Sequence, residues 1–192
     1  MRKIFAIALA AVAAVSCGNK EGRPVEEALQ KKVMEENPDL VSYKVEKVRT
    51  EVAVRLPDEL SRREGIYSSQ VHYREGKVAE YQKKGMPNNV AKQRKALGHM
   101  SSVLEDLQQY RGIYAPQMDS VIYYVVSFTG SGSTKDGRQV KGQEMKAAVG
   151  PDLRVYQIVT AEDNVYRGMG RAVPAYDYII ARNRAEYSEE ED

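Results

Sequence analysis

The sequence predicts an α+β fold in which an antiparallel sheet packs against helices. Apolar residues recur at helical spacing in residues 24–36 and again in residues 58–112. From residue 121 the pattern changes to that of strands, with turn-forming residues between closely spaced segments. Strands this close in sequence pair as an antiparallel meander, which we expect as the C-terminal, three-strand part of the sheet. The length of 192 residues fits one domain, predicted over residues 24–185.

The composition excludes several classes of protein. A hydrophobic content of 42% with 29% charged residues is typical of a globular protein and excludes collagen-like and fully disordered chains. The mean hydropathy of −0.56, with no apolar run near the ~20 residues of a membrane span after the first sixteen residues, excludes a multi-span membrane protein. The single cysteine excludes an internal disulfide.

Residues 1–16 have the features of a secretion signal peptide. Arg2 and Lys3 form a basic start, and residues 4–15 are apolar without interruption. This apolar run is too short for a stable membrane-spanning helix, which needs about 20 residues. The sequence therefore predicts that this segment is a cleaved signal.

The cysteine, Cys17, stands where the apolar run ends and a polar segment begins. Ser16 before it is small, while Ala14 occupies the position where leucine is usual in a lipobox. With these residues the start of the chain resembles the signal of bacterial lipoproteins, and the resemblance covers residues 1–17 only. It implies that Cys17 is lipid-modified, that residues 17–23 form a tether, and that the membrane is a partner through the N-terminal lipid.

Two other interpretations of this region stay open. In the first, cleavage after Ala13 or after Ser16 releases an ordinary secreted protein with Cys17 near its new terminus. In the second, the segment is not cleaved and Cys17 is a small apolar residue in a retained helix. If the cysteine is lipidated, the residue that follows is Gly18 and not the aspartate that marks inner-membrane retention in enteric bacteria. This favours the outer membrane over the inner membrane as the site of anchoring in the cell envelope.

The charge balance gives no reason to expect nucleic-acid binding. Removal of residues 1–16 takes away Arg2 and Lys3 and leaves equal numbers of basic and acidic residues. Residues 186–192 form an acidic tail, which we expect to be disordered. One basic cluster is either a solvated helix surface or a contact for anionic lipid headgroups or an acidic partner. It consists of Lys83, Lys84, Lys92, Arg94 and Lys95.

The first helix and the first strand follow from their apolar periods. Pro24 suits the first turn of a helix that ends at Asn37-Pro38, and one face of this helix carries Val25, Ala28, Leu29 and Val33. Residues 41–56 then alternate between apolar and polar, but the parity of the alternation changes near Lys47. This slip predicts a bulge or two strand segments. Pro57 ends the strand region.

The middle of the chain predicts two helices. Apolar residues recur at helical spacing on either side of a break at residues 85–89, and Gly112 closes the second helix. Gly65 and Gly76 each cost a helix about 1 kcal/mol relative to alanine. Residues 66–73 also fit a short strand, so the sequence leaves their state open.

The last third predicts the meander. Residues 121–129 are almost continuously apolar, which is typical of a strand buried on both faces. The expected elements that follow are a hairpin loop at 130–137, a second strand at 140–149, a turn at 150–152, a third strand at 153–160 and a short helix from Pro174.

This order of helix, strand, helical segment and meander is similar to that of the cystatin and NTF2-like superfolds, in which a curved sheet wraps a helix. The similarity rests on element order alone. It implies, for the NTF2-like case, a small-ligand or hydrolase pocket with tyrosine and aspartate side chains inside the sheet.

Motifs for catalysis are missing from the sequence. His72 and His99 are too few and too far apart for a zinc site, which needs three or four ligands. The glycine-rich stretch 130–137 lacks both the G-x-S-x-G and the phosphate-loop patterns. We therefore expect no catalytic residue, no metal and no cofactor.

Tyrosine is the compositional anomaly, with 13 tyrosines against two phenylalanines and no tryptophan. Tyr123 and Tyr124 are predicted on opposite faces of the meander, and Tyr156 would reach one of those faces. Such rings serve sheet packing or form a binding face, where tyrosine is enriched. The expectation from the sequence is a lipid-anchored, non-enzymatic envelope module that binds a protein or a peptidoglycan-associated component. The alternative is an NTF2-like pocket protein.

Overall fold

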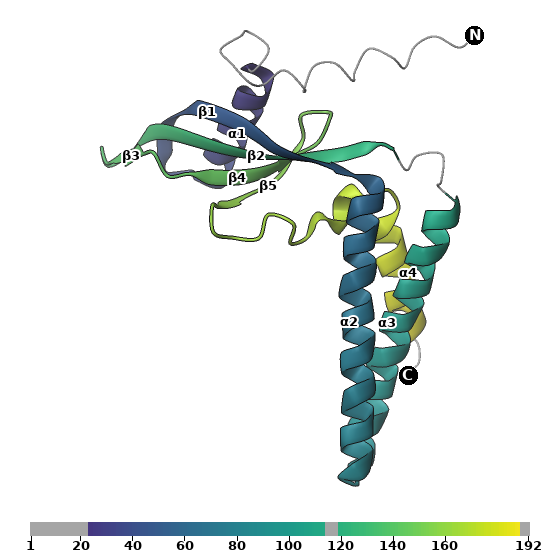
Figure 1. Cartoon of the computed structure of the whole chain (residues 1–192). Coiled ribbons are helices and arrows are strands. Elements are labelled where there is room, and N and C mark those ends of the chain that lie inside the picture. Colours follow the sequence, from purple (N-terminus) through teal and green to yellow (C-terminus); the bar gives the residue numbers. More distant parts are fainter. Residues whose placement is uncertain (1–22, 114–118, 189–192) are drawn as a thin grey trace, which may run out of the picture. The chain divides into compact units, whose positions relative to one another are not determined.

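The computed structural model describes residues 23–113 and 119–188 (Figure 1). The predicted signal peptide and Cys17 lie outside the described residues. The chain divides into two compact units. The sheet unit comprises the described residues up to Val54 together with Val121–Ala172, and the helical unit comprises the described residues of Arg55–Ser120 and those from Val173 onward. The domain predicted over 24–185 is thus built of two units, each with its own core.

The sheet unit contains one helix and an antiparallel sheet, which confirms the α+β class. Its strands run in the order β1-β2-β4-β5, and β3 pairs with the outer part of β2. The elements are α1 (Arg23–Glu36), β1 (Leu40–Arg55), β2 (Val121–Thr134), β3 (Gln139–Lys141), β4 (Met145–Val149), β5 (Val155–Thr160) and the 3-10 helix η2 (Met169–Ala172). The sequential pairing of β2, β4 and β5 is the predicted meander.

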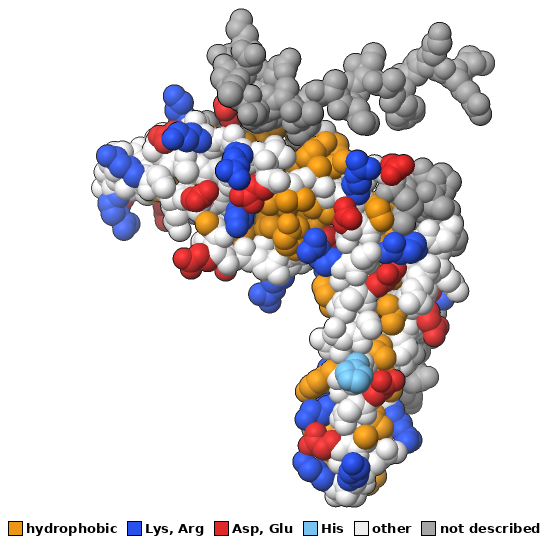
Figure 2. All heavy atoms as spheres, viewed as in Figure 1, with side chains coloured by type: hydrophobic (Ala, Val, Ile, Leu, Met, Phe, Trp, Pro, Cys, Tyr) orange, Lys and Arg blue, Asp and Glu red, His pale blue; other side chains and the backbone are white. Residues whose placement is uncertain are grey.

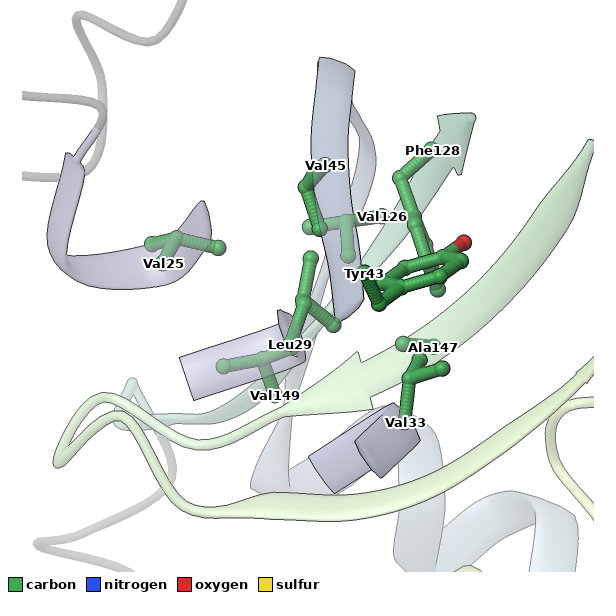
Figure 3. Packing of buried hydrophobic residues seen from close by; sticks show 9 residues of the cluster. All are labelled: Val25, Leu29, Val33, Tyr43, Val45, Val126, Phe128, Ala147 and Val149. Atoms are coloured by element: carbon green, nitrogen blue, oxygen red, sulfur yellow. The ribbon is translucent and has the colours of Figure 1, made fainter. Parts of the chain in front are cut away.

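Buried side chains lie on both faces of this sheet. On one face α1 packs against the sheet (Figure 3), in a cluster that holds Val25, Leu29, Val33, Tyr43, Val45, Val126, Phe128, Ala147 and Val149. The opposite face carries a second cluster of Val54, Tyr123, Val125, Ala148, Val165 and Met169. Because alternate residues of β2 enter the two clusters, this strand is buried on both faces, as predicted.

The first helix and strand form as their patterns predict. The Asn37 side-chain amide donates a hydrogen bond of 2.8 Å to the carbonyl oxygen of Val33, which satisfies an acceptor at the end of α1. In β1, Val45 and Val48 differ in parity but pack against the same cluster, so the change of parity near Lys47 is present in the packing. Because β1 is one continuous strand, the predicted alternative of two strand segments is wrong, and a bulge at this position stays a prediction. The strand ends at Arg55, and Leu56 begins the next helix.

The glycine-rich stretch was predicted as a hairpin loop at 130–137, and this is wrong for its first half. Strand β2 continues to Thr134. A Cβ atom on Gly130 would lie 2.5 Å from the hydroxyl oxygen of Tyr43, and one on Gly132 would collide with the carbonyl oxygen of Ser42. These glycines therefore allow close approach of β1, which a local sequence pattern does not distinguish from a loop.

The second predicted strand, 140–149, is in fact two. The segment between β3 and β4 contains Gly142 at a φ of 60°. This left-handed conformation suits glycine and interrupts a strand. The predicted third strand is shorter than expected, since Leu153, at a φ of 66°, still belongs to the turn and β5 begins at Val155.

The helical unit consists of α2 (Leu56–Lys83), α3 (Pro87–Ile113) and α4 (Tyr176–Ser188). The first two form a hairpin whose turn contains Gly85 at a φ of 63° (Figure 1). Residues 66–73, left open by the sequence, are helical. Helix α4 packs on α3 and begins two residues after Pro174, close to the predicted start. It includes residues 186–188 of the predicted disordered tail, and residues 189–192 lie outside the described part.

The core of the helical unit lies where α4 contacts the hairpin. Its apolar members include Leu60, Leu107 and Ile179. Glu59 is completely buried, and Arg63 donates a hydrogen bond of 2.6 Å from its Nε atom to Oε1 of Glu59. The side-chain amide of the buried Asn183 donates a hydrogen bond of 2.9 Å to the Asp106 carboxylate and one of 2.8 Å to the carbonyl oxygen of Ile179. Of these polar contacts, the one between Asn183 and Asp106 joins α4 to α3 of the hairpin.

Candidate functional site

The three tyrosines proposed from the sequence do not form one surface. Tyr123 is fully buried in the cluster opposite α1, and the half-buried Tyr156 packs against the same cluster. Tyr124 packs on the other face, against the α1 cluster. The predicted alternation of Tyr123 and Tyr124 is correct, but a binding face that includes Tyr123 is not, because a buried ring has no surface to offer.

Tyr156 is the more accessible ring on its face. The guanidinium of Arg154 lies 5.2 Å from the ring centre, within the range of a cation–π contact. Burial raises the pKa of the Tyr156 hydroxyl, and the Asp152 carboxylate raises it further. Arg154 and Arg171 act in the opposite sense and lower this pKa in part.

The cavity beside Tyr124 is too small for a metabolite. It has a volume of about 10 Å³, which is room for about one water molecule. Its lining is mostly apolar and consists of Val25, Val48, Thr50, Tyr124, Val126, Val149, Gly150 and Leu153. The α1 face of the sheet is thus a filled core at this position and not a ligand pocket.

The two histidines lie on different helices of the hairpin. His72 on α2 is exposed, with its Nδ1 atom 3.9 Å from a carboxylate oxygen of Glu75, and His99 on α3 is half-buried. Within residues 23–113 and 119–188 no three side chains of histidine, cysteine, aspartate or glutamate are grouped so that they could hold a metal ion.

The part of the hairpin between Arg63 and Val103 has a different character, although near its start the Tyr67 hydroxyl still lies 3.3 Å from the Tyr176 hydroxyl of α4. We call residues 64–102 the distal hairpin. No side chain in this range is buried, whereas Arg63 and Val103 on either side of it are. Its apolar side chains are half-exposed between the two helices and include Val71, Val78, Tyr81, Val90, Leu97 and Met100. Two helices alone do not enclose a core, because each side chain between them keeps contact with water.

One face of α2 in the distal hairpin is exposed and partly apolar. Ile66 is 44% exposed and Tyr73 is 54% exposed, although both are large hydrophobic residues. They are seven residues apart and so lie on the same side of the helix. The Tyr73 ring is flanked by two cations, with the Arg74 guanidinium 5.5 Å and the Lys77 ammonium 5.9 Å from its centre.

Small residues share this face. By helical geometry Gly65, Ser69 and Gly76 lie beside Ile66 and Tyr73. A Cβ atom on either glycine would meet nothing within 4 Å, so no contact of the described residues requires glycine there. We call these five residues the α2 face. It is exposed and combines three small residues with two large apolar side chains, a combination that allows another helix to pack closely.

Sequence reasoning missed the α2 face as a site. Helical periodicity identifies α2 but does not tell whether its outer side is covered. The one available signal was the pair of glycines, each unfavourable inside a helix by about 1 kcal/mol and without a local turn to explain it.

No helix in the described part of the chain is both long and apolar enough to cross a membrane. Comparisons with family models, with curated proteins and with solved structures found no match for this chain.

Proposed function

We propose that this protein is a lipid-anchored, non-enzymatic binding module of the cell envelope, and that its α2 face binds a helix of a protein partner. The observation that carries the proposal is the distal hairpin, in which no side chain is buried while Ile66 and Tyr73 are exposed. Exposed apolar surface costs roughly 25 cal/mol per Å², a cost that a partner helix would remove.

The glycines support a helical partner over other shapes. Gly65 and Gly76 weaken α2 without any contact in the described residues that calls for them. On a face that receives another helix, small residues let the two backbones approach, and large neighbours such as Tyr73 then pack beside the contact. Tyrosine is also among the residues that contribute most to protein interfaces.

The alternative, an NTF2-like pocket protein, has less support. Such a function needs a deep cavity with polar side chains, and ligand pockets commonly measure about 300–1,000 Å³. The cavity next to Tyr124 has a volume of about 10 Å³ and an apolar lining. The filled core therefore favours a binding surface over a pocket.

The anchor is proposed from the lipobox-like signal and tested at Cys17. A thiol at the start of the mature chain can carry a diacylglyceryl group, and each buried CH₂ adds about 0.8 kcal/mol of membrane affinity. We expect the wild-type protein to partition into the detergent phase and Cys17→Ser to partition into the aqueous phase without lipid labelling. Mass spectrometry that finds an unmodified Cys17, or a mature terminus elsewhere, would contradict the anchor.

The proposed binding face is tested by site-specific photocrosslinking in intact cells. A photoreactive phenylalanine analogue replaces Ile66 or Tyr73 on the α2 face, and Val41 or Tyr178 as controls. The controls are as exposed as the test positions, at 55% and 69%, but Val41 lies on β1 and Tyr178 on α4. We expect one defined protein adduct from the α2 face and none of the same mass from the control positions.

A matched variant separates binding from folding. Gly76→Leu replaces a helix-weakening residue with a good helix former, and its Cβ meets nothing within 4 Å. We expect its melting temperature to equal or exceed that of the wild type, while the adduct at Tyr73 disappears because the added side chain blocks close approach. Equal adducts from all four positions, or an adduct that survives Gly76→Leu, would refute the proposed face.

A further inference from the structure

The end of the hairpin carries a positive charge that its own residues do not balance. We call residues 82–95 the hairpin tip. It contains the five basic residues that the sequence singled out, and no aspartate or glutamate occurs anywhere from residue 81 to residue 104. Lys83, Lys92 and Arg94 are exposed. The charge is thus concentrated where α2 ends and α3 begins.

The acidic residue nearest to the hairpin tip in sequence, Glu80, is already paired with two lysines. Glu80 accepts hydrogen bonds of 2.7 Å from Lys77 and 2.6 Å from Lys84. These two ammonium groups lower the pKa of Glu80 to about 2, so it stays ionised and paired. Its single negative charge offsets only one of these two cations, and no carboxylate among residues 81–104 offsets the exposed Lys83, Lys92 and Arg94.

The hairpin tip also has apolar surface, at the turn between its two groups of basic residues. Met86 is 41% exposed in the turn, between Gly85 and Pro87. It borders an open hollow of about 420 Å³ lined by Gln82, Gly85, Met86, Pro87, Val90, Ala91 and Arg94. Figure 2 shows blue side chains and orange surface next to one another at this end of the hairpin.

We propose that the hairpin tip docks on the surface of an anionic phospholipid bilayer, with Met86 entering the headgroup region and the basic side chains contacting lipid phosphates. An apolar side chain surrounded by lysine and arginine matches the interface, where hydrocarbon and anionic headgroups lie side by side. Each basic residue near such a surface adds to the affinity of a protein for the bilayer. The long stems of lysine and arginine can cover apolar surface while their charges reach the phosphates.

A bilayer fits this tip better than an acidic protein does. The tip is the turn of a hairpin, in which the exposed Met86 lines the same hollow as Arg94 and follows Lys83 and Lys84 closely in sequence, so it presents charge and apolar surface together to a flat interface. The inference rests on the proposed function in one respect, since a lipid anchor keeps the hairpin tip at high effective concentration near a membrane. It does not depend on the partner of the α2 face.

The test uses the mature chain from residue 17 with Cys17→Ser, so that no acyl chain contributes to binding. Co-sedimentation is measured with vesicles of phosphatidylcholine alone and of phosphatidylcholine mixed with phosphatidylglycerol. We expect binding to the anionic vesicles only, weakening as salt screens the charges. Substituting Lys83, Lys92 and Arg94 with glutamine is expected to reduce the partition coefficient by at least about tenfold. Met86→Ser is expected to reduce it on its own.

A matched triple variant controls for the loss of net charge. Lys44, Lys47 and Lys135 are exposed basic residues of the sheet unit, and their change to glutamine removes the same charge. We expect this control to bind anionic vesicles as the parent does, and circular dichroism should show every variant folded. The proposal is overturned if neutral vesicles bind equally, if the control and tip variants lose equal affinity, or if only soluble polyglutamate binds the tip. Any of these results leaves the crosslinking at Tyr73 unaffected.

Discussion

Val125→Asp is expected to unfold the sheet unit. Val125 lies in the middle of β2, directly opposite Ala148 of β4, and its side chain is 2% exposed in the cluster opposite α1. An aspartate there must either bury its charge or take up a proton, and both options cost several kcal/mol. Domains are stable by only about 5–15 kcal/mol, so this cost removes most of the stability or all of it.

A second valine of the same sheet provides the control. Val52 lies on β1 and is 44% exposed, so an aspartate at this position keeps its hydration. Far-ultraviolet circular dichroism and thermal unfolding are measured for Val125→Asp and Val52→Asp. We expect the first to lose the cooperative transition and the second to change the melting temperature slightly. A wild-type melting temperature for Val125→Asp would contradict the assignment of β2 as the strand buried on both faces.

Glu59→Ala is expected to destabilise the helical unit by about 3–5 kcal/mol, because it leaves a buried guanidinium without its counterion. Glu59 is fully buried and Arg63 is 6% exposed. The Glu59 carboxylate accepts from Arg63 at 2.6 Å and from Arg62 at 3.2 Å. The Arg63 guanidinium also lies 6.0 Å from the ring centre of Tyr176, the first residue of α4. If Arg63 moves after the Glu59 carboxylate is removed, we expect α4 to move as well.

Two variants show whether the effect comes from the unpaired charge. Glu75→Ala removes an exposed carboxylate of the same helix, 3.9 Å from His72, and should cost no more than about 0.5 kcal/mol. The double variant Glu59→Leu with Arg63→Met replaces both charges with apolar groups and should recover most of the lost stability. Urea unfolding gives the free energies. If Glu59→Ala is as mild as Glu75→Ala, the pair does not stabilise this unit.

Local patterns were sufficient to predict most of the fold. The helical face of Val25, Leu29 and Val33, the break before Pro87 and the apolar run of β2 each follow from residues near one another in sequence. The errors arise where distant segments decide the outcome. Residue 130 lies in a strand whose neighbour β1 leaves no room for a Cβ atom, which accounts for the glycine there, and no pattern around residue 130 contains that information.

The candidate site could be predicted only in part. Tyr123 and Tyr124 were placed correctly on opposite faces, but the sequence does not show that the cluster around Val165 and Met169 covers Tyr123. Helix α2 was predicted, whereas the exposure of Tyr73 depends on whether another segment of the chain covers the outer side of this helix. Burial is a property of the assembled chain, and periodicity reports only which side of a helix is apolar.

Hydrogen exchange along the hairpin of the isolated protein shows whether the distal hairpin has a core of its own. Amides open locally with free energies that follow the burial around them. We expect strong protection of the backbone amides in Leu56–Arg63 and near Val103, and a steep fall in amide protection within residues 64–102. If protection stays uniform from Leu56 to the turn, at the level of the β2 amides, the hairpin is stably folded without a partner. That result would contradict the proposal that the distal hairpin lacks a core of its own.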